Sequence, residues 1–159
     1  MLIRAAGLAD LGAVWEIERE VFRTDIYPRF FFRQAHDLWG DLLRVAESDS
    51  GALVGYALGA LGAEAGEAWI LSAAVLPEQR GRGIATRLTR DLLDVLRSRG
   101  ARGVRLTVHP ENHGAIRLYE RLGFQTIGRD ADYYGPGDPR LLMRLELPGE
   151  RSHSVSADS

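Results

Sequence analysis

Cysteine and lysine are both absent from this sequence of 159 residues. Without cysteine the chain has no disulfide, no zinc–thiolate site, no iron–sulfur cluster and no thiol nucleophile. Without lysine it has neither a phosphate-binding-loop lysine nor a lysine that forms a Schiff base with a substrate. Composition alone therefore excludes any reaction that passes through an acyl-cysteine or a lysine imine.

A basic excess and a long apolar run are also missing. Twenty basic side chains against 22 acidic ones give a net charge of −2, which disfavours non-specific binding to nucleic acid. The longest mainly apolar run, Ala52 to Ala63, contains three glycines and is well short of the ~20 residues that a membrane helix needs. The first residues lack the apolar stretch of a signal peptide. We expect a cytoplasmic protein with no membrane or nucleic-acid partner.

The composition that remains is that of one globular domain, with 45% hydrophobic and 26% charged residues. We expect this domain to occupy residues 1–147. The segment 148–159 is rich in serine and has too few apolar residues to offset the entropy of ordering it. We therefore predict that 148–159 is a mobile C-terminal tail.

Hydrophobic periodicity predicts an α/β fold. The expected helices are 11–22, 27–39, 83–99 and 112–122, and the expected strands are 2–4, 42–47, 52–60, 68–76, 103–108, 124–128 and 141–147. The resulting order is β-α-α-β-β-β-α-β-α-β-β. It favours a mixed, mostly antiparallel central sheet with helices on both faces.

One glycine-rich stretch, Arg80-Gly81-Arg82-Gly83, runs from a strand directly into an amphipathic helix. The glycines permit a tight turn, and the free N–H groups of the first helical turn attract an anion. An arginine at this positive helix end costs about 0.3–1 kcal/mol unless an anion compensates it. The stretch therefore predicts a phosphate ligand, with a plain glycine turn as the alternative. It lacks the third glycine of a dinucleotide-binding loop, which disfavours a nucleotide-binding module.

A second stretch runs from Asn112 to Phe124. Asn112 precedes a helix, so its simplest role is that of an N-cap. Tyr119 falls on the apolar stripe of that helix, so its simplest role is that of a core aromatic with its hydroxyl at the edge.

Taken together, the two stretches resemble the GNAT superfamily of acyl-CoA-dependent N-acyltransferases. The matching patterns are Arg80-x-x-Gly83-x-Ala85 after a strand and Asn112-x-x-Ala115-x-x-Leu118-Tyr119-x-x-x-Gly123-Phe124. The resemblance covers roughly residues 68–147, and the element order of the whole chain agrees with it. It implies an enzyme that transfers an acetyl group from acetyl-CoA directly to a primary amine.

The resemblance also implies roles for individual residues. The backbone of Ala73, Ala74 and Val75 would hold the pantetheine arm. The cofactor pyrophosphate would bind to Arg80, Gly81, Arg82, Gly83, Ile84, Ala85 and Thr86. Asn112 would bond to the cofactor, and Tyr119 would protonate the departing thiolate as the general acid.

Within the superfamily, the chain looks like the ribosomal-protein and peptide N-terminal acetyltransferases. Those enzymes commonly have a glutamate where this chain has Thr107, and a threonine hydroxyl is no base at neutral pH. His109 is a candidate base because histidine titrates near neutrality; Glu111 and a chain of water molecules are alternatives. The other histidines, His36, His113 and His153, lack the spacing of metal ligands, so no metal site is expected.

Two segments are expected to flank the acceptor side of the cleft, residues 23–32 and 130–140. Their aromatic and acidic side chains suit a cationic amine. The acceptor is open between a protein N-terminus and a small-molecule amine. A non-catalytic acyl-CoA-binding or sensing module is the alternative function, because a fold does not fix an activity. The terminal strand, 141–147, is expected to end near an exposed sheet edge that pairs in a homodimer.

Overall fold

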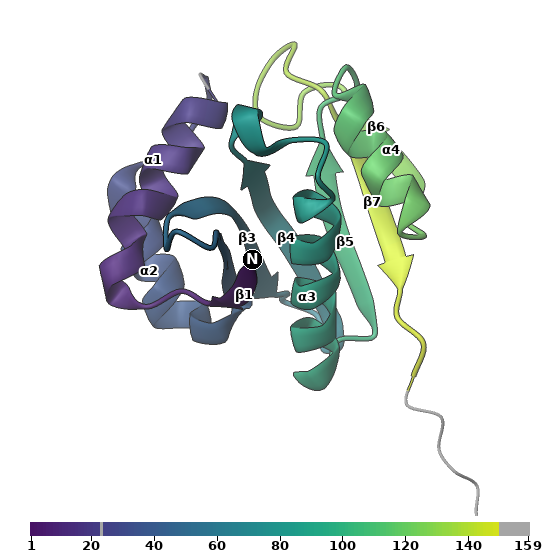
Figure 1. Ribbon diagram of the computed structural model, residues 1–159. Coiled ribbons are helices and arrows are strands. Elements are labelled where there is room, and N and C mark those ends of the chain that lie inside the picture. The colour runs from purple at the N-terminus through teal and green to yellow at the C-terminus, as the bar shows by residue number, and fades with distance from the viewer. Residues whose placement is uncertain (23, 150–159) are drawn as a thin grey trace, which may run out of the picture.

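The computed structural model describes residues 1–22 and 24–149, and it confirms the predicted order of helices and strands (Figure 1). The helices are α1 (Leu11–Val21), α2 (Arg29–Trp39), α3 (Ile84–Ser98) and α4 (His113–Arg121). The strands are β1 (Leu2–Ala5), β2 (Leu43–Glu47), β3 (Leu53–Leu61), β4 (Glu67–Val75), β5 (Gly103–Val108), β6 (Gln125–Asp130) and β7 (Arg140–Glu146). Residues 150–159 of the predicted tail lie outside the described residues, so its mobility stays a prediction.

Helix α3 shows why the periodicity was informative. The four residues of the predicted stripe, Ile84, Leu88, Leu92 and Leu96, are all buried, and Leu93 beside them is buried as well. After the helix ends, Gly100 has a φ of +92°, the left-handed conformation that a glycine adopts without strain. The chain can therefore turn sharply from α3 into β5.

The seven strands form one sheet in the order β1-β2-β3-β4-β5-β7-β6. Every neighbouring pair is antiparallel except β4 and β5, which are parallel and connected through α3. A parallel pair requires such a crossover, because the chain must return to the end of the sheet where it started. The predicted mixed, mostly antiparallel sheet is thus confirmed.

The expected position of the terminal strand at an exposed edge is wrong. Strand β7 lies between β5 and β6 and pairs with both, from Gly103↔Glu146 to Val108↔Leu141 on one side and from Gln125↔Arg144 to Asp130↔Arg140 on the other. The hairpin of β6 and β7 folds back toward the centre of the sheet, so β6 takes the edge. A homodimer stays a prediction, with β1 and β6 as the two edge strands of the sheet, and light scattering on the purified chain checks it.

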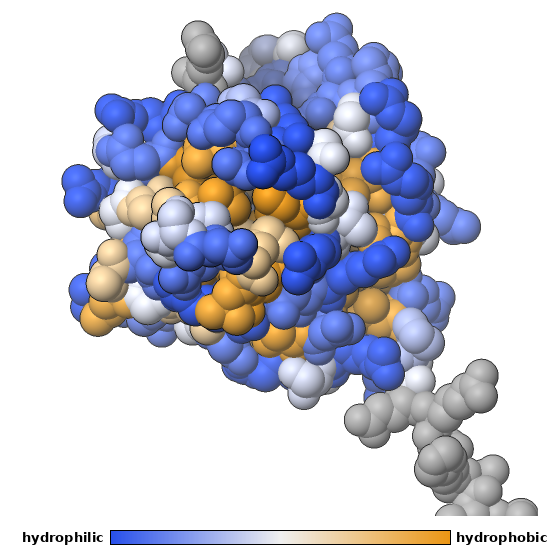
Figure 2. Space-filling view, viewed as in Figure 1, coloured by the Kyte–Doolittle hydropathy of each residue, from blue (hydrophilic) through white to orange (hydrophobic). Residues whose placement is uncertain are grey.

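Helices cover both faces of the sheet and divide the apolar residues into two cores. Helices α1 and α2 pack on one face and α3 and α4 on the other, as Figure 1 shows. On the face drawn in Figure 2, apolar residues reach the surface in patches that hydrophilic side chains separate. None of the helices within residues 1–22 and 24–149 combines the length and the apolar character that crossing a membrane requires.

Candidate active site

The site begins where two neighbouring strands separate. Strands β4 and β5 pair over Glu67–Trp69 and Gly103–Arg105, yet they continue to Val75 and Val108. Beyond the paired stretch, backbone N–H and C=O groups on the facing edges are left for another partner, since strand groups are strong hydrogen-bonding groups. The gap is therefore a place where an extended ligand can bind in the manner of an added strand.

A bulge in β4 lies beside this gap. The register with β3 passes from Leu58↔Ser72 to Gly59↔Ile70, so Leu71 is an extra residue in β4. Bulges turn the backbone locally and are frequent next to active sites. The N–H and C=O groups at this point of β4 are thus turned out of the regular ladder, next to the gap.

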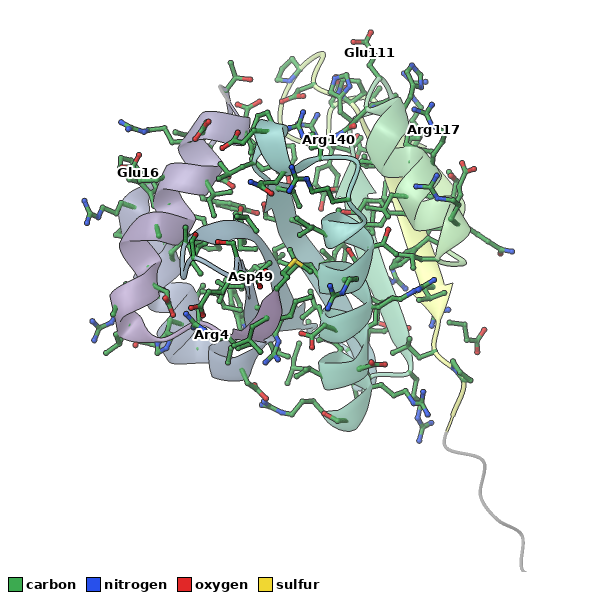
Figure 3. All side chains as sticks on the ribbon, in the orientation of Figure 1. Arg4, Glu16, Asp49, Glu111, Arg117 and Arg140 are labelled. Carbon is green, nitrogen blue, oxygen red and sulfur yellow. The ribbon has the colours of Figure 1, made fainter. Side chains whose placement is uncertain are left out.

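A cavity of about 620 Å³ occupies the gap. The sheet, α4 with its N-terminal turn, α1 with the segment after it, and the loop between β6 and β7 all contribute to its wall. The lining residues are Ile70, Leu71, Ser72, Ala73, Leu106, Thr107, Val108, His109, Asn112, Ala115, Tyr119, Glu18, Phe22, Thr24, Asp25, Tyr27, Tyr134, Asp138 and Arg140. Both segments predicted to flank the cleft, 23–32 and 130–140, supply lining residues. Figure 3 shows Arg140 and Glu111 at the same upper end of the molecule, beside the start of α4.

The glycine-rich turn has the backbone conformation that an anion site needs. Gly81 and Gly83 have φ angles of +79° and +76°, where other residues are strained, and Gly83 is the N-cap of α3. A Cβ at either glycine would meet nothing within 4 Å, so the space above the helix end is open. The first-turn N–H groups of Ile84, Ala85 and Thr86 lie at this end.

The side chains around the glycine-rich turn also suit the binding of an anion. Arg80 and Arg82 are exposed at the positive end of the helix dipole, where an anionic ligand offsets their cost. Ile84 turns its side chain into the core, so it can contribute to a ligand through its N–H group alone. The segment predicted to hold the pyrophosphate is thus compatible with a diphosphate.

The three residues predicted to hold the pantetheine arm form the end of β4. Ala74 and Val75 bury their side chains in opposite cores, while Ala73 lines the cavity. All three pair with β3, over Gly55–Ala57, along one edge of β4. Their backbone groups on the other edge face the gap, which is the arrangement that the predicted contact requires.

Asn112 and Tyr119 meet at the cavity from the two ends of α4. The Asn112 side chain accepts a hydrogen bond from the N–H of Ala115 at 3.2 Å, so it is an N-cap, and Asn112 also lines the cavity. Tyr119 is buried and packs edge-to-face on Phe124 at 5.5 Å between ring centroids. Burial raises the pKa of the Tyr119 hydroxyl to about 12, so the group carries its proton at neutral pH. It is thus available as a proton donor.

His109 lies in the cavity wall, but one of its nitrogens is engaged. Its Nδ1 atom accepts a hydrogen bond from the N–H of Glu111 at 3.1 Å. In the neutral ring the proton is then on Nε2, so the basic lone pair is used by the turn. Its role as a base stays a prediction that must compete with this bond. Thr107 lines the cavity as well.

Sequence reasoning missed one charged residue of the cavity, Glu18. It is 2% exposed in α1, where it accepts hydrogen bonds from the Tyr56 hydroxyl and from the N–H of Tyr27 at 3.3 Å. Burial raises the pKa of Glu18, and these hydrogen bonds partly oppose the shift. The signal was present, because Glu18 stands four residues after Val14 and one after Ile17, on the apolar stripe of the helix.

Within the described part of the chain, no group of three or more histidine, aspartate or glutamate side chains is placed to hold a metal ion.

Comparisons of the sequence and of the structure with known proteins point to the same family. The family model described as "Acetyltransferase (GNAT) family" matches residues 11–124. The uncharacterized N-acetyltransferase MJ1530 of Methanocaldococcus jannaschii is 35% identical over 95% of both chains. A putative ribosomal protein bS18-alanine N-acetyltransferase of Bacillus subtilis is 30% identical over 91% of this chain and 95% of its own. The crystal structure of Ard1 from Thermoplasma volcanium superposes with a TM-score of 0.85 at 26% identity, covering 92% of this chain and 97% of that one.

Proposed function

This chain belongs to the GNAT family of acetyltransferases, and on that premise we propose that it acetylates the free α-amino group of a protein N-terminus. It is an enzyme of the acetyl-CoA-dependent N-acetyltransferase class. The observation that carries the proposal is the gap between β4 and β5, whose cavity reaches helices on both faces of the sheet. A relative named for acetylating the alanine of a ribosomal protein supports the choice of acceptor.

The two-sided cavity suggests how the reactants meet. The turn before α3 and the start of α4 would hold acetyl-CoA on one face, and the amine would enter beside α1 on the other. The amine attacks the thioester carbonyl directly, since the chain has no cysteine to carry the acetyl group. Backbone N–H groups near the β4 bulge would stabilise the oxyanion, and Tyr119 would protonate the departing thiolate.

The turn at Gly83 gives the first prediction. Acetyl-CoA at 100 times its Kd should stabilise the wild-type protein by ~2.7 kcal/mol, which raises the Tm by about 5–11 °C for a domain of this size. Gly83→Asp should abolish this shift, because its carboxylate would stand at the pyrophosphate position. Differential scanning fluorimetry with CoA measures the shift.

Gly83→Asn is the matched control for the charge. Asparagine and aspartate have the same shape and both tolerate a positive φ better than other side chains. We expect Gly83→Asn to retain more of the CoA-induced shift than Gly83→Asp. A folded Gly83→Asp protein with an unchanged shift would remove the pyrophosphate from this turn.

The acceptor is tested by thiol release from acetyl-CoA. Peptides with a free α-amino group should release CoA faster than polyamines, amino sugars or the same peptides with a blocked N-terminus. Mass spectrometry of the product should place the acetyl group on the α-nitrogen. Turnover of small amines alone would overturn the choice of acceptor. Tight acetyl-CoA binding without thiol release by any amine would favour the sensing module.

A further inference from the structure

We propose that Glu18 is the general base that takes the proton from the acceptor ammonium group, on the side of the cavity opposite Tyr119. This inference rests on the function proposed above. It assigns a role to a buried carboxyl group that the family resemblance left without one.

The placement of Glu18 is the first support. It projects from α1, which packs on the face of the sheet opposite α4, and it forms part of the cavity wall. Among the ion pairs of the described residues none involves Glu18, so its charge is not neutralised by a neighbouring arginine. Glu16, two residues earlier, is more than half exposed, pairs with Arg19 and points outward from α1 in Figure 3. A buried, unpaired carboxylate at a cavity is a costly arrangement, which is frequent at functional sites.

The hydrogen bonds around Glu18 fix its carboxylate without occupying it. Tyr27 donates its N–H to Oε1, and Tyr56 donates its hydroxyl proton to Oε2. Because Tyr56 has given away its one proton, Ser72 must donate in the 2.7 Å bond between their two hydroxyl oxygens. A carboxylate has about four acceptor positions, so Glu18 can still accept a proton from the cavity.

The titratable residues that hydrogen-bond to Glu18 are both tyrosines, while Asp25, His109, Asp138 and Arg140 also line the cavity. Tyr56 comes from β3 and Tyr27 from the segment after α1, and burial is the main reason that both of their pKa values are raised. The pKa of Tyr27 is raised to about 12. Both phenols are therefore neutral at pH 7, so neither adds a charge beside Glu18.

The chemistry requires a base at this place. An α-ammonium group has a pKa of about 7.7–8.0, so most acceptor molecules are protonated at pH 7 and cannot attack. Thr107, on the opposite strand, offers no base. Because burial raises the pKa of Glu18, its affinity for a proton comes closer to that of the amine, which favours transfer between them.

The proton balance closes with Glu18 and Tyr119 acting together. An N–H bond of the ammonium group breaks, its electron pair stays on nitrogen, and Glu18 gains the proton. The nitrogen then bonds to the acyl carbon, and the carbonyl electron pair moves to oxygen to form the oxyanion. As the carbonyl forms again, the carbon–sulfur bond breaks and Tyr119 protonates the thiolate. The nitrogen loses its second proton to solvent, and solvent returns one proton to the Tyr119 phenolate, so Tyr119 ends the cycle protonated. Glu18 returns its proton to solvent, the single proton that acetylation of an ammonium group releases.

Glu18→Gln tests the proposal, because glutamine keeps the shape of the side chain and removes its basicity. With a peptide acceptor, kcat/KM at pH 7 should fall by about 10²–10⁴-fold, while the Tm shift with CoA stays at the wild-type value. The loss should shrink as the pH rises through the pKa of the amine, since solvent then supplies the free base. Glu16→Gln, on the outer surface of α1, should behave as wild type.

Tyr56→Phe gives a readout that a packing role would not produce. Its hydroxyl stabilises the charged form of Glu18, so removing it raises the pKa of that carboxyl further. A base must be deprotonated to act, so the acidic limb of the kcat/KM profile should move to higher pH, with activity recovered above the limb. If the acidic limb of the kcat/KM profile lies at the same pH in Tyr56→Phe as in the wild type, the proposal is contradicted.

The remaining outcomes separate the two proposals. Wild-type kcat/KM in Glu18→Gln, or a loss of equal size at every pH, overturns the role of Glu18 alone. If only small amines are acetylated and Glu18→Gln shows the predicted pH profile with them, the role of Glu18 as the base stands. The choice of a protein N-terminus as the acceptor is then overturned. A wild-type protein that releases no thiol with any amine overturns both.

Discussion

Replacing Tyr119 with phenylalanine is expected to lower kcat by about 10²–10⁴-fold while the Kd for acetyl-CoA changes little. The ring and its edge-to-face contact with Phe124 are retained, and the only loss is the proton that the hydroxyl carries. A proton given to the leaving thiolate acts in the transition state and contributes little to ground-state binding. Rapid thiol-release kinetics and a direct titration with acetyl-CoA measure the two constants separately.

Stability and pH dependence provide the checks on Tyr119→Phe. Phenylalanine is nearly isosteric, so the free energy of unfolding should stay within about 1.5 kcal/mol of wild type. A pKa of about 12 keeps the acid protonated from neutral pH to about pH 11, so Tyr119 should give no basic limb in that range. Full activity of Tyr119→Phe on its true amine would mean that water or another group protonates the thiolate.

Phe32→Ala is expected to destabilise the protein by about 3–5 kcal/mol. Phe32 is 0% exposed, and its ring meets those of Tyr27, Phe31 and Tyr56 edge-on at centroid distances of 6.3, 5.8 and 5.6 Å. Truncation removes the buried ring and leaves a cavity between α2 and the sheet, because the neighbouring rings are fixed by the same core. The Tm should fall by about 6–20 °C.

Phe30→Ala is the matched control on the same helix. Phe30 is 67% exposed, so its truncation should change the free energy of unfolding by no more than about 0.5 kcal/mol. Urea unfolding followed by circular dichroism measures both variants. A loss below 1 kcal/mol in Phe32→Ala would show that this core is loosely packed and would weaken the argument that it holds Tyr56 in place against Glu18.

Much of the site could be predicted from the sequence because its signals are local. The left-handed turns at Gly81 and Gly83 and the N-cap at Asn112 depend on residues within one helical turn of each other. Tyr119 was found through its position in a spaced pattern that the family resemblance supplied. Glu18 was missed because a charged residue on an apolar stripe has meaning only when its partners are known, and Tyr56 lies 38 residues away.

The sequence by itself determined the kinds and order of the elements, because periods of 3.6 and 2 residues are properties of each segment alone. It also excluded thiol and lysine chemistry, since absent side chains cannot be supplied by folding. Only the tertiary structure decided that β7 enters the sheet between β5 and β6 and that β4 and β5 separate after three paired residues. These features depend on hydrogen bonds and packing between distant segments, which no local pattern of residues records. The cavity, and the meeting of Glu18 and Tyr119 in its walls, follow from that separation.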